Sequence, residues 1–156
     1  MVKANEFLNV CQKCKATCCK MGGPDFTEKE MKKVLKAVHK NYFIKLDKNH
    51  YELKSKRGRC PYLKKDNSCE IHKVKPLICL CWPVLSKFKK DRREFLIVEC
   101  PMTPLLSKKD IEKCKKEASK IPRKIVENGW KMSTIPESEL KIILKRFKKF
   151  KKKKLR

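Results

Sequence analysis

The clearest pattern in the chain is a run of apolar residues at helical spacing that follows Thr27. Glu30 stands three residues after Thr27, which is the spacing of a capping box, where two side chains satisfy the first free N–H groups of a helix. The apolar positions of the run are Met31, Val34, Leu35 and Val38. Their spacing of three and four residues predicts a helix over residues 28–39 that buries this face.

Alternation of apolar and polar residues predicts two β-hairpins. In the first, strands over residues 42–46 and 50–54 are joined by the turn Asp47-Lys48-Asn49. In the second, strands over residues 84–89 and 94–100 are joined by residues 90–93. The second hairpin would return Cys100 toward the cysteines that precede it.

Three further helices are predicted in the C-terminal third of the chain. The first covers residues 107–121 and begins with the capping-box spacing. A short helix follows over residues 122–128 and ends at Gly129. The last begins after Ser133, with acidic residues in its first turn and lysines toward its end, a distribution that suits the helix dipole.

Together these elements predict an α+β fold. We expect a small cysteine-rich, metal-stabilised domain with two short hairpins and flanking helices, followed by a basic C-terminal helix. The chain of 156 residues has the length of one ordinary domain. We expect residues 1–104 to form the cysteine-rich domain, and residues 105–156 to form a helical segment that ends in a Lys-rich tail.

Cysteines form two dense clusters. The first places four sulfurs within the nine residues from Cys11 to Cys19, and the second places four within the 22 residues from Cys60 to Cys81. Cys-x2-Cys spacing is typical of zinc sites and iron–sulfur clusters, although a disulfide knot is the alternative. Because neighbouring side chains on an extended backbone point to opposite sides, we expect Cys18 and Cys19 to serve two sites, or one of them to remain outside coordination.

The apolar segments of the chain bear on its location. Residues 1–10 contain no apolar run of the length found in a signal peptide, so we expect a cytoplasmic protein with reduced thiols. The longest mainly apolar stretch, residues 76–85, is about half the roughly 20 residues that a membrane-spanning helix needs. No membrane span is therefore expected.

Net charge is extreme. The chain has 43 basic and 17 acidic side chains and a net charge of +26, whereas a magnitude of about 2–8 keeps a small domain soluble. The excess favours a polyanionic partner, and we expect RNA or a ribonucleoprotein particle such as the ribosome. The alternative is the composition of a thermophile, in which Lys and Glu rise together, but here only Lys is abundant.

The order of the cysteine segments resembles that of a zinc- or iron-chelating domain family, named for its Cys-x2-Cys-x2-Cys-Cys opening. After the opening, this family has Cys-Pro-aromatic-Leu, Cys-x-Ile-Tyr, Arg-Pro and Cys-Arg-x-aromatic-Pro segments and a last cysteine. The matching segments are Cys60-Pro61-Tyr62-Leu63, Cys69-Glu70-Ile71-His72, Lys75-Pro76, Cys79-Leu80-Cys81-Trp82-Pro83 and Cys100. The chain departs from the family at His72, Lys75 and Leu80, and by a third residue between Cys14 and Cys18.

The resemblance implies eight metal ligands and either zinc or an iron–sulfur cluster such as 4Fe–4S as cofactor. Eight sulfurs suit two four-ligand sites, or one such site with the other thiols buried nearby. Cys81 and Cys114 lie outside the pattern, and Cys114 is expected in the core of its helix. The eight positions are Cys11, Cys14, Cys18, Cys19, Cys60, Cys69, Cys79 and Cys100.

The last twelve residues are the strongest candidate for nucleic-acid binding, because they contain nine basic and no acidic side chains. A solvated tail and a helix on a membrane surface are the alternatives. The nine residues are Lys145, Arg146, Lys148, Lys149, Lys151, Lys152, Lys153, Lys154 and Arg156.

These features predict a metal-binding protein that associates with RNA or the ribosome. The chain has four glycines and neither a phosphate-binding loop nor a dinucleotide fingerprint, so an enzyme would have to use the metal centre. A segment like the cysteine clusters occurs in flagellin lysine methylases. The alternative is therefore an iron–sulfur-dependent redox or protein-modifying, methylase-like enzyme or its accessory subunit.

Overall fold

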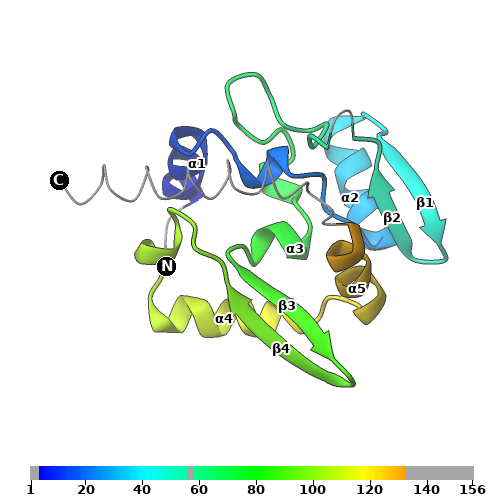
Figure 1. Cartoon of the computed structure of the whole chain (residues 1–156). Coiled ribbons are helices and arrows are strands. Elements are labelled where there is room, and N and C mark those ends of the chain that lie inside the picture. The colour runs from blue at the N-terminus through cyan, green and yellow to red at the C-terminus, as the bar shows by residue number, and fades with distance from the viewer. Residues whose placement is uncertain (1–3, 56–57, 133–156) are drawn as a thin grey trace.

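The structure is a computed structural model that describes residues 4–55 and 58–132. Figure 1 shows helices around two separate antiparallel hairpins, which confirms the α+β class. The predicted helix after Ser133 lies outside the described residues. In chain order the elements are α1 (Ala4–Lys13), η1 (Cys18–Lys20), α2 (Glu28–Val38), β1 (Phe43–Asp47), β2 (His50–Leu53), η2 (His72–Val74), α3 (Leu77–Leu80), β3 (Val84–Lys89), β4 (Arg92–Ile97), η3 (Thr103–Leu105), α4 (Lys108–Ala118) and α5 (Arg123–Met132).

Helix α2 begins with the predicted capping box. The Glu30 N–H donates to Thr27 Oγ1 at 3.3 Å, and the Thr27 N–H donates to Glu30 Oε2 at 2.9 Å. The other carboxylate oxygen, Glu30 Oε1, accepts from the Leu77 N–H at 2.8 Å. One side chain thus caps α2 and also fixes the first residue of α3 against it.

Both hairpins form, with one shift from the predicted register. In the first, Phe43 pairs with Leu53, as the alternating pattern predicts. In the second, Lys89 pairs with Arg92, so the turn has two residues and β4 ends at Ile97. The predicted strand 94–100 was therefore placed too late, and Cys100 follows the strand instead of belonging to it.

The helices at the ends of the described chain differ from prediction in three places. Helix α4 has the predicted capping box, with Ser107 and Asp110 as partners, but it ends at Ala118 and not at residue 121. Helix α5 continues through Gly129 to Met132, so the predicted end at Gly129 is wrong. Helix α1, which contains Cys11, was not predicted, because no capping residue precedes it and it runs into a cysteine cluster.

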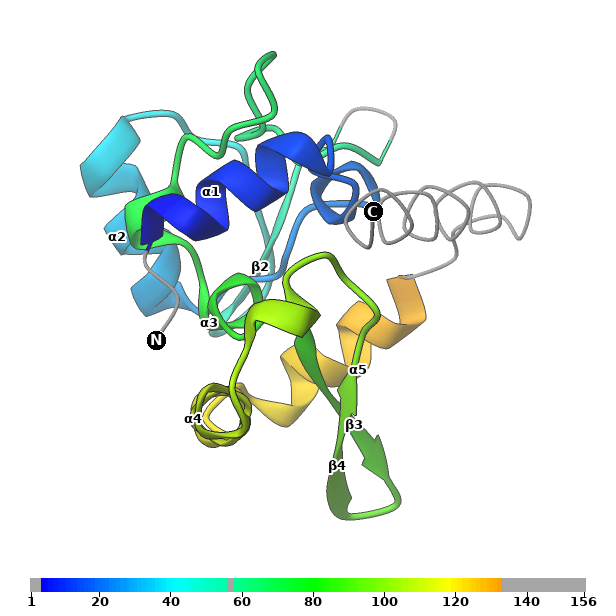
Figure 2. The ribbon, with the colours of Figure 1, turned by 90° about the vertical axis from the view of Figure 1, so that its left-hand side faces the viewer.

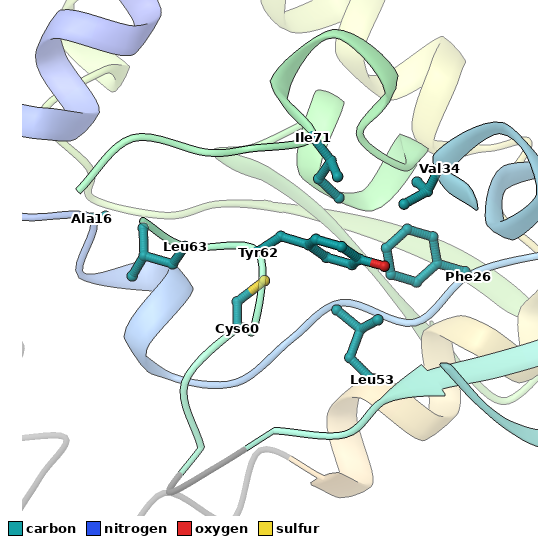
Figure 3. Packing of buried hydrophobic residues seen from close by; sticks show 8 residues of the cluster. All are labelled: Ala16, Phe26, Val34, Leu53, Cys60, Tyr62, Leu63 and Ile71. Atoms are coloured by element: carbon teal, nitrogen blue, oxygen red, sulfur yellow. The ribbon is translucent and has the colours of Figure 1, made fainter. Parts of the chain in front are cut away.

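The buried residues form two hydrophobic cores. The first core, shown in Figure 3, surrounds Tyr62, whose hydroxyl donates to the Lys40 carbonyl at 2.7 Å. The second core joins α3, the β3–β4 hairpin, α4 and α5 around Cys81, Ala118 and Ile125. Its residues begin at Leu77, so each core is built mainly from one half of the described chain. The predicted division at residue 104 stays a prediction.

Arg93, on strand β4, connects the β3–β4 hairpin to the end of α4 beside the second core. Its guanidinium donates to the Ala118 carbonyl at 3.1 Å and to the Ile121 carbonyl at 2.7 Å, and it lies over the Phe88 ring at 4.5 Å. Carbonyls at the end of a helix lack partners within the helix. Arg93 therefore satisfies the end of α4 and sets the distance between α4 and the hairpin, which are adjacent in Figure 2.

A buried polar cluster connects α5 to the first half of the chain. Asp25 Oδ2 lies 2.7 Å from His50 Nε2 and accepts from Asn128 Nδ2 at 2.7 Å. His50 is buried in β2, and the Asp25 side chain is 10% exposed. A buried carboxylate needs such partners, because removing one leaves its charge less well satisfied. No helix among residues 4–55 and 58–132 has the length and apolar character needed to cross a lipid bilayer.

We predict that Asn128→Ala lowers the free energy of unfolding by about 1–3 kcal/mol, because Asp25 loses a buried donor. Asn128→Asp should cost more, because it places a second carboxylate beside Asp25. Urea unfolding measures both variants. Asn9→Ala, at an exposed position on α1, is the control and should change stability by less than about 0.5 kcal/mol. Equal stability of all three variants would contradict the structural role of the cluster.

Candidate metal centre

The first cysteine cluster begins on a helix and continues through a left-handed turn. Cys11 lies in the last turn of α1, and its carbonyl accepts from the Ala16 N–H at 2.8 Å. Lys15 and Ala16 have φ angles of 60° and 49°, in the left-handed region that non-glycine residues rarely occupy. The Thr17 hydroxyl then donates to the Cys14 carbonyl at 2.9 Å. The extra residue between Cys14 and Cys18 is thus accommodated in a tight reversal of the chain.

Cys18 and Cys19 form the start of a short 3₁₀-helix, η1, so the extended backbone assumed from the sequence is wrong for this pair. Their thiols are hydrogen-bonded to each other, which raises the pKa of Cys18 well above its usual value. The same bond lowers the pKa of Cys19 to about 7, although burial acts in the opposite direction. The helical backbone therefore places the two sulfurs side by side.

Three cationic side chains also stabilise the Cys19 thiolate. Lys75, Lys20 and Arg59 each lower the pKa of this thiol. Lys20 directly follows Cys19 in the sequence, and Arg59 directly precedes Cys60. This adjacency is the only sequence signal that could have identified the two basic residues. Lys75 occupies the position of the family's Arg, and its ammonium also lies 5.2 Å from the centroid of the Phe7 ring on α1.

The second cysteine cluster is joined to the first through the backbone. The Cys60 N–H donates to the Cys19 carbonyl at 2.9 Å, which brings residues 41 positions apart into direct contact. A β-bridge between Leu63 and Cys69 then folds the next segment back on itself. Cys60 is buried beside Tyr62 in the first core (Figure 3).

Cys79 completes this group from α3. Burial raises its pKa well above the usual value, and the sulfurs of Cys19, Cys60 and Cys69 add to the effect. Burial likewise raises the pKa of Cys60 to about 12, and again Cys19 and Cys69 contribute. Cys19 raises the pKa of Cys60, Cys69 and Cys79, so η1, the 60–69 segment and α3 each bring a thiol near Cys19.

The pKa values of Cys11 and Cys100 also depend on other thiols. Burial raises the pKa of Cys11 to about 12, and Cys19, Cys100 and Cys14 contribute. Burial also raises the pKa of Cys100, and Cys14 adds to it. The Cys100 N–H donates to Thr103 Oγ1 at 3.2 Å, which fixes the backbone after β4. The pKa of Cys11 is thus raised by both Cys19 and Cys100.

The other two cysteines lie elsewhere. Cys81 is 1% exposed within the second core, and Cys114 packs against the same core from α4, as predicted. Burial raises the pKa of Cys81 to about 12, with Cys114 as the next cause. All ten cysteines are free thiols, so the structure contains no disulfide knot.

Thiols are donors that suit a soft metal. Within residues 4–55 and 58–132, no group of three or more His, Cys, Asp or Glu side chains could hold a metal ion as it stands. However, burial disfavours the charged form of these thiols, and a bound cation supplies the compensating charge. Among the residues that the structure describes, the buried Trp82 Nε1 has no partner at full hydrogen-bond geometry, although its N–H lies close enough to Cys100 to lower the pKa of that thiol. A metal-bound sulfur is a suitable acceptor for it.

These features define a thiol-rich metal-binding domain. The chain matches the model of the family described as "Putative zinc- or iron-chelating domain" over residues 10–116, and it belongs to that family. The matched range contains all eight predicted ligands, whose assignment stays a prediction, and zinc and iron–sulfur both fit the family. Searches of curated proteins and of solved structures found no match. The predicted nucleic-acid-binding residues, Lys145 to Arg156, lie outside the described residues.

We predict that Lys15→Gly raises the free energy of unfolding by roughly 0.5–1 kcal/mol, because glycine occupies the left-handed region without a steric penalty. Lys15 is exposed, so the substitution removes no buried contact. Urea unfolding of the metal-loaded protein gives the change, and metal content should stay constant. Lys13→Gly, at the last residue of α1, is the matched control and should lower stability by about 0.5–1 kcal/mol. A stability loss of the same size in both variants would contradict the strain at Lys15.

Proposed function

We propose that this protein is a metal-stabilised module in which the eight cysteines from Cys11 to Cys100 hold zinc or an iron–sulfur cluster, and that it binds RNA or a ribonucleoprotein particle such as the ribosome. The observation that supports the metal centre most strongly is the Cys60 N–H to Cys19 carbonyl hydrogen bond. It places the two cysteine clusters together by backbone geometry, independently of how the side chains rotate.

The proposed ligands come from elements that belong to both halves of the chain. Cys19 and Cys69 pack against the first core, whereas Cys79 lies on α3, whose Leu77 and Ile78 pack against the second. When bound, the metal supplies a cross-link between these segments and balances the charge of their thiolates. Lys75, Lys20 and Arg59 stabilise the thiolate of Cys19, and Trp82 provides an N–H toward Cys100.

Two arrangements of the thiols are consistent with their positions. Two four-ligand sites would divide the eight thiols, with the ligands of one drawn from Cys18, Cys19, Cys60, Cys69 and Cys79, and with Cys11, Cys14 and Cys100 in the other together with one of those five. A single four-ligand site would leave the remaining thiols buried nearby. Anaerobic purification followed by metal analysis and an absorption spectrum distinguishes these cases, because about four irons with visible absorption indicate a cluster and colourless protein with zinc indicates zinc sites.

We predict that Cys69→Ser lowers metal content and thermal stability together, because a structural metal contributes directly to folding. Loss of about 3 kcal/mol or more would lower the melting temperature by roughly 10 °C in a chain of this size. Cys114→Ala is the matched control, since Cys114 packs against the second core, and it should leave metal content unchanged. A Cys69→Ser protein that loses metal but melts at the wild-type temperature would refute the coupling.

The proposal of RNA binding is supported by the net charge of +26 and by the nine basic side chains among the last twelve residues. Each phosphate that the protein neutralises releases counterions, so affinity falls as salt concentration rises. The proposed tail lies beyond every predicted metal ligand in the sequence. Its contribution can therefore be removed without changing the metal centre.

We predict that deletion of residues 145–156 weakens RNA binding and flattens its salt dependence. The slope of log affinity against log salt should decrease by about 0.7 for each lost contact with single-stranded RNA. Filter binding or fluorescence anisotropy over a salt series measures this, with metal content as the control. Equal slopes for the full and shortened chains would make the tail a solvated end, and loss of binding to anionic vesicles alone would support a membrane-surface helix instead.

A further inference from the structure

A cavity of about 770 Å³ lies between the two halves of the molecule. Its walls come from α2, from the segment that contains η2 and α3, and from the α4–α5 connection. This volume is within the range of sites that bind several side chains of a ligand. None of the eight proposed metal ligands is among its lining residues.

The floor of the cavity is aliphatic. Ile121, in the connection between α4 and α5, is 6% exposed, and Ile125, on α5, is 2% exposed. Leu77 and Ile78 of α3 pack against the same core. Leu80, which also lines the cavity, is 49% exposed. These side chains form the edge of the second core, so a ligand with aliphatic groups would extend that core when it binds.

The rim of the cavity is strongly cationic. Lys29, Lys33 and Lys36 follow one face of α2 at helical spacing, and Lys73 faces them from η2. All four are exposed, and within residues 4–55 and 58–132 none of them forms an ion pair. Their charges are therefore available to a ligand.

The acidic residues that line the cavity do not offset these lysines by pairing with them. Both carboxylate oxygens of Glu30 accept hydrogen bonds from Thr27 and Leu77, within the fold. Asp25 likewise accepts from Asn128 and contacts His50. The negative groups are thus used internally, whereas the positive groups of α2 face outward. Such an arrangement favours an anionic ligand.

From this combination we infer that the cavity binds an acidic peptide segment of a partner protein, with aliphatic side chains on the floor and carboxylates beside Lys29 and Lys33. An amphipathic helix places both kinds of side chain on adjacent strips, as recognition in a groove requires. RNA fits less well, because the floor is aliphatic and the described lining contains a single aromatic ring, that of His72, whereas single-stranded nucleic acid is held by successive stacked bases. This inference is independent of the proposed RNA binding and of the metal.

The test uses the full metal-loaded chain and a fluorescein-labelled helical peptide that carries leucines at positions i, i+3, i+4 and i+7 and glutamates elsewhere. Its controls are a peptide of the same composition in scrambled order and a single-stranded RNA of equal charge. We expect the patterned peptide to bind at least tenfold more tightly than the scrambled one, because only the former can place all leucines on the floor.

Two variants examine the rim and the floor separately. Lys29→Glu with Lys33→Glu should weaken binding of the patterned peptide at least tenfold, and Leu80→Gln should weaken it several-fold. Lys108→Glu with Lys109→Glu is the matched control: it changes the charge equally, at the start of α4, and neither residue lines the cavity. It should change peptide affinity less than threefold. Melting curves establish that every variant is folded.

Three outcomes would overturn the inference. Equal binding of the patterned and scrambled peptides would show that only charge is recognised. Equal weakening by the α2 pair and the α4 pair would show that the cavity has no special role. If the α2 pair weakens RNA binding and leaves peptide binding unchanged, the surface is a nucleic-acid interface instead.

Discussion

The hydrogen bond between the Cys60 N–H and the Cys19 carbonyl, 2.9 Å long, is the contact on which the arrangement of the thiols depends. It joins a 3₁₀-helix near the N-terminus to the segment that leads into the second cysteine cluster. Residues of both clusters also pack in the first core, where Cys19 and Cys69 lie against its buried side chains. With the hydrogen bond in place, Cys19 lies close enough to Cys60, Cys69 and Cys79 to raise the pKa of each. The backbone therefore brings these thiols near one another, and rotation of the side chains can adjust the distances between the sulfurs.

This concentration of thiols explains why the surrounding positions are basic. A buried thiol resists ionisation, and several thiolates in one region repel one another. A metal ion offsets part of this cost, but four thiolates around a divalent ion still leave a net negative charge. Lys75, Lys20 and Arg59 oppose that charge at Cys19, where the pKa is about 7. Part of the excess of basic residues in this chain is thus accounted for by the chemistry of its own interior.

The sequence predicted the features that depend on local rules. Both capping boxes formed where Thr27 and Ser107 indicated them, since this motif needs only residues three positions apart. The hairpins also formed, but the second was shifted because Lys90, with a φ of 55°, allows a two-residue turn that the charged sequence does not reveal. Gly129 was interpreted as a helix end, whereas α5 continues through it. Propensity alone does not decide such a position.

The features that the sequence did not reveal are those set by contacts between distant segments. The side chains of Cys18 and Cys19 would point to opposite sides only on an extended backbone. In the structure the backbone of this pair is helical. The pairing of Asp25 with Asn128 links positions 103 residues apart, and no local pattern in either segment indicates it. The same holds for Glu30, whose second oxygen accepts from Leu77.

Contacts between distant segments determine how the two cores are positioned relative to each other. Glu30 connects α2 to α3, and Asp25 connects β2 to α5 through His50 and Asn128. Both connections border the cavity between the halves, and both hold their carboxylates in hydrogen bonds within the fold instead of in ion pairs with the lysines of α2. The interactions that join the halves therefore also leave the α2 rim positively charged. A surface suited to an acidic ligand is thus a direct consequence of the contacts that join the two halves of this protein.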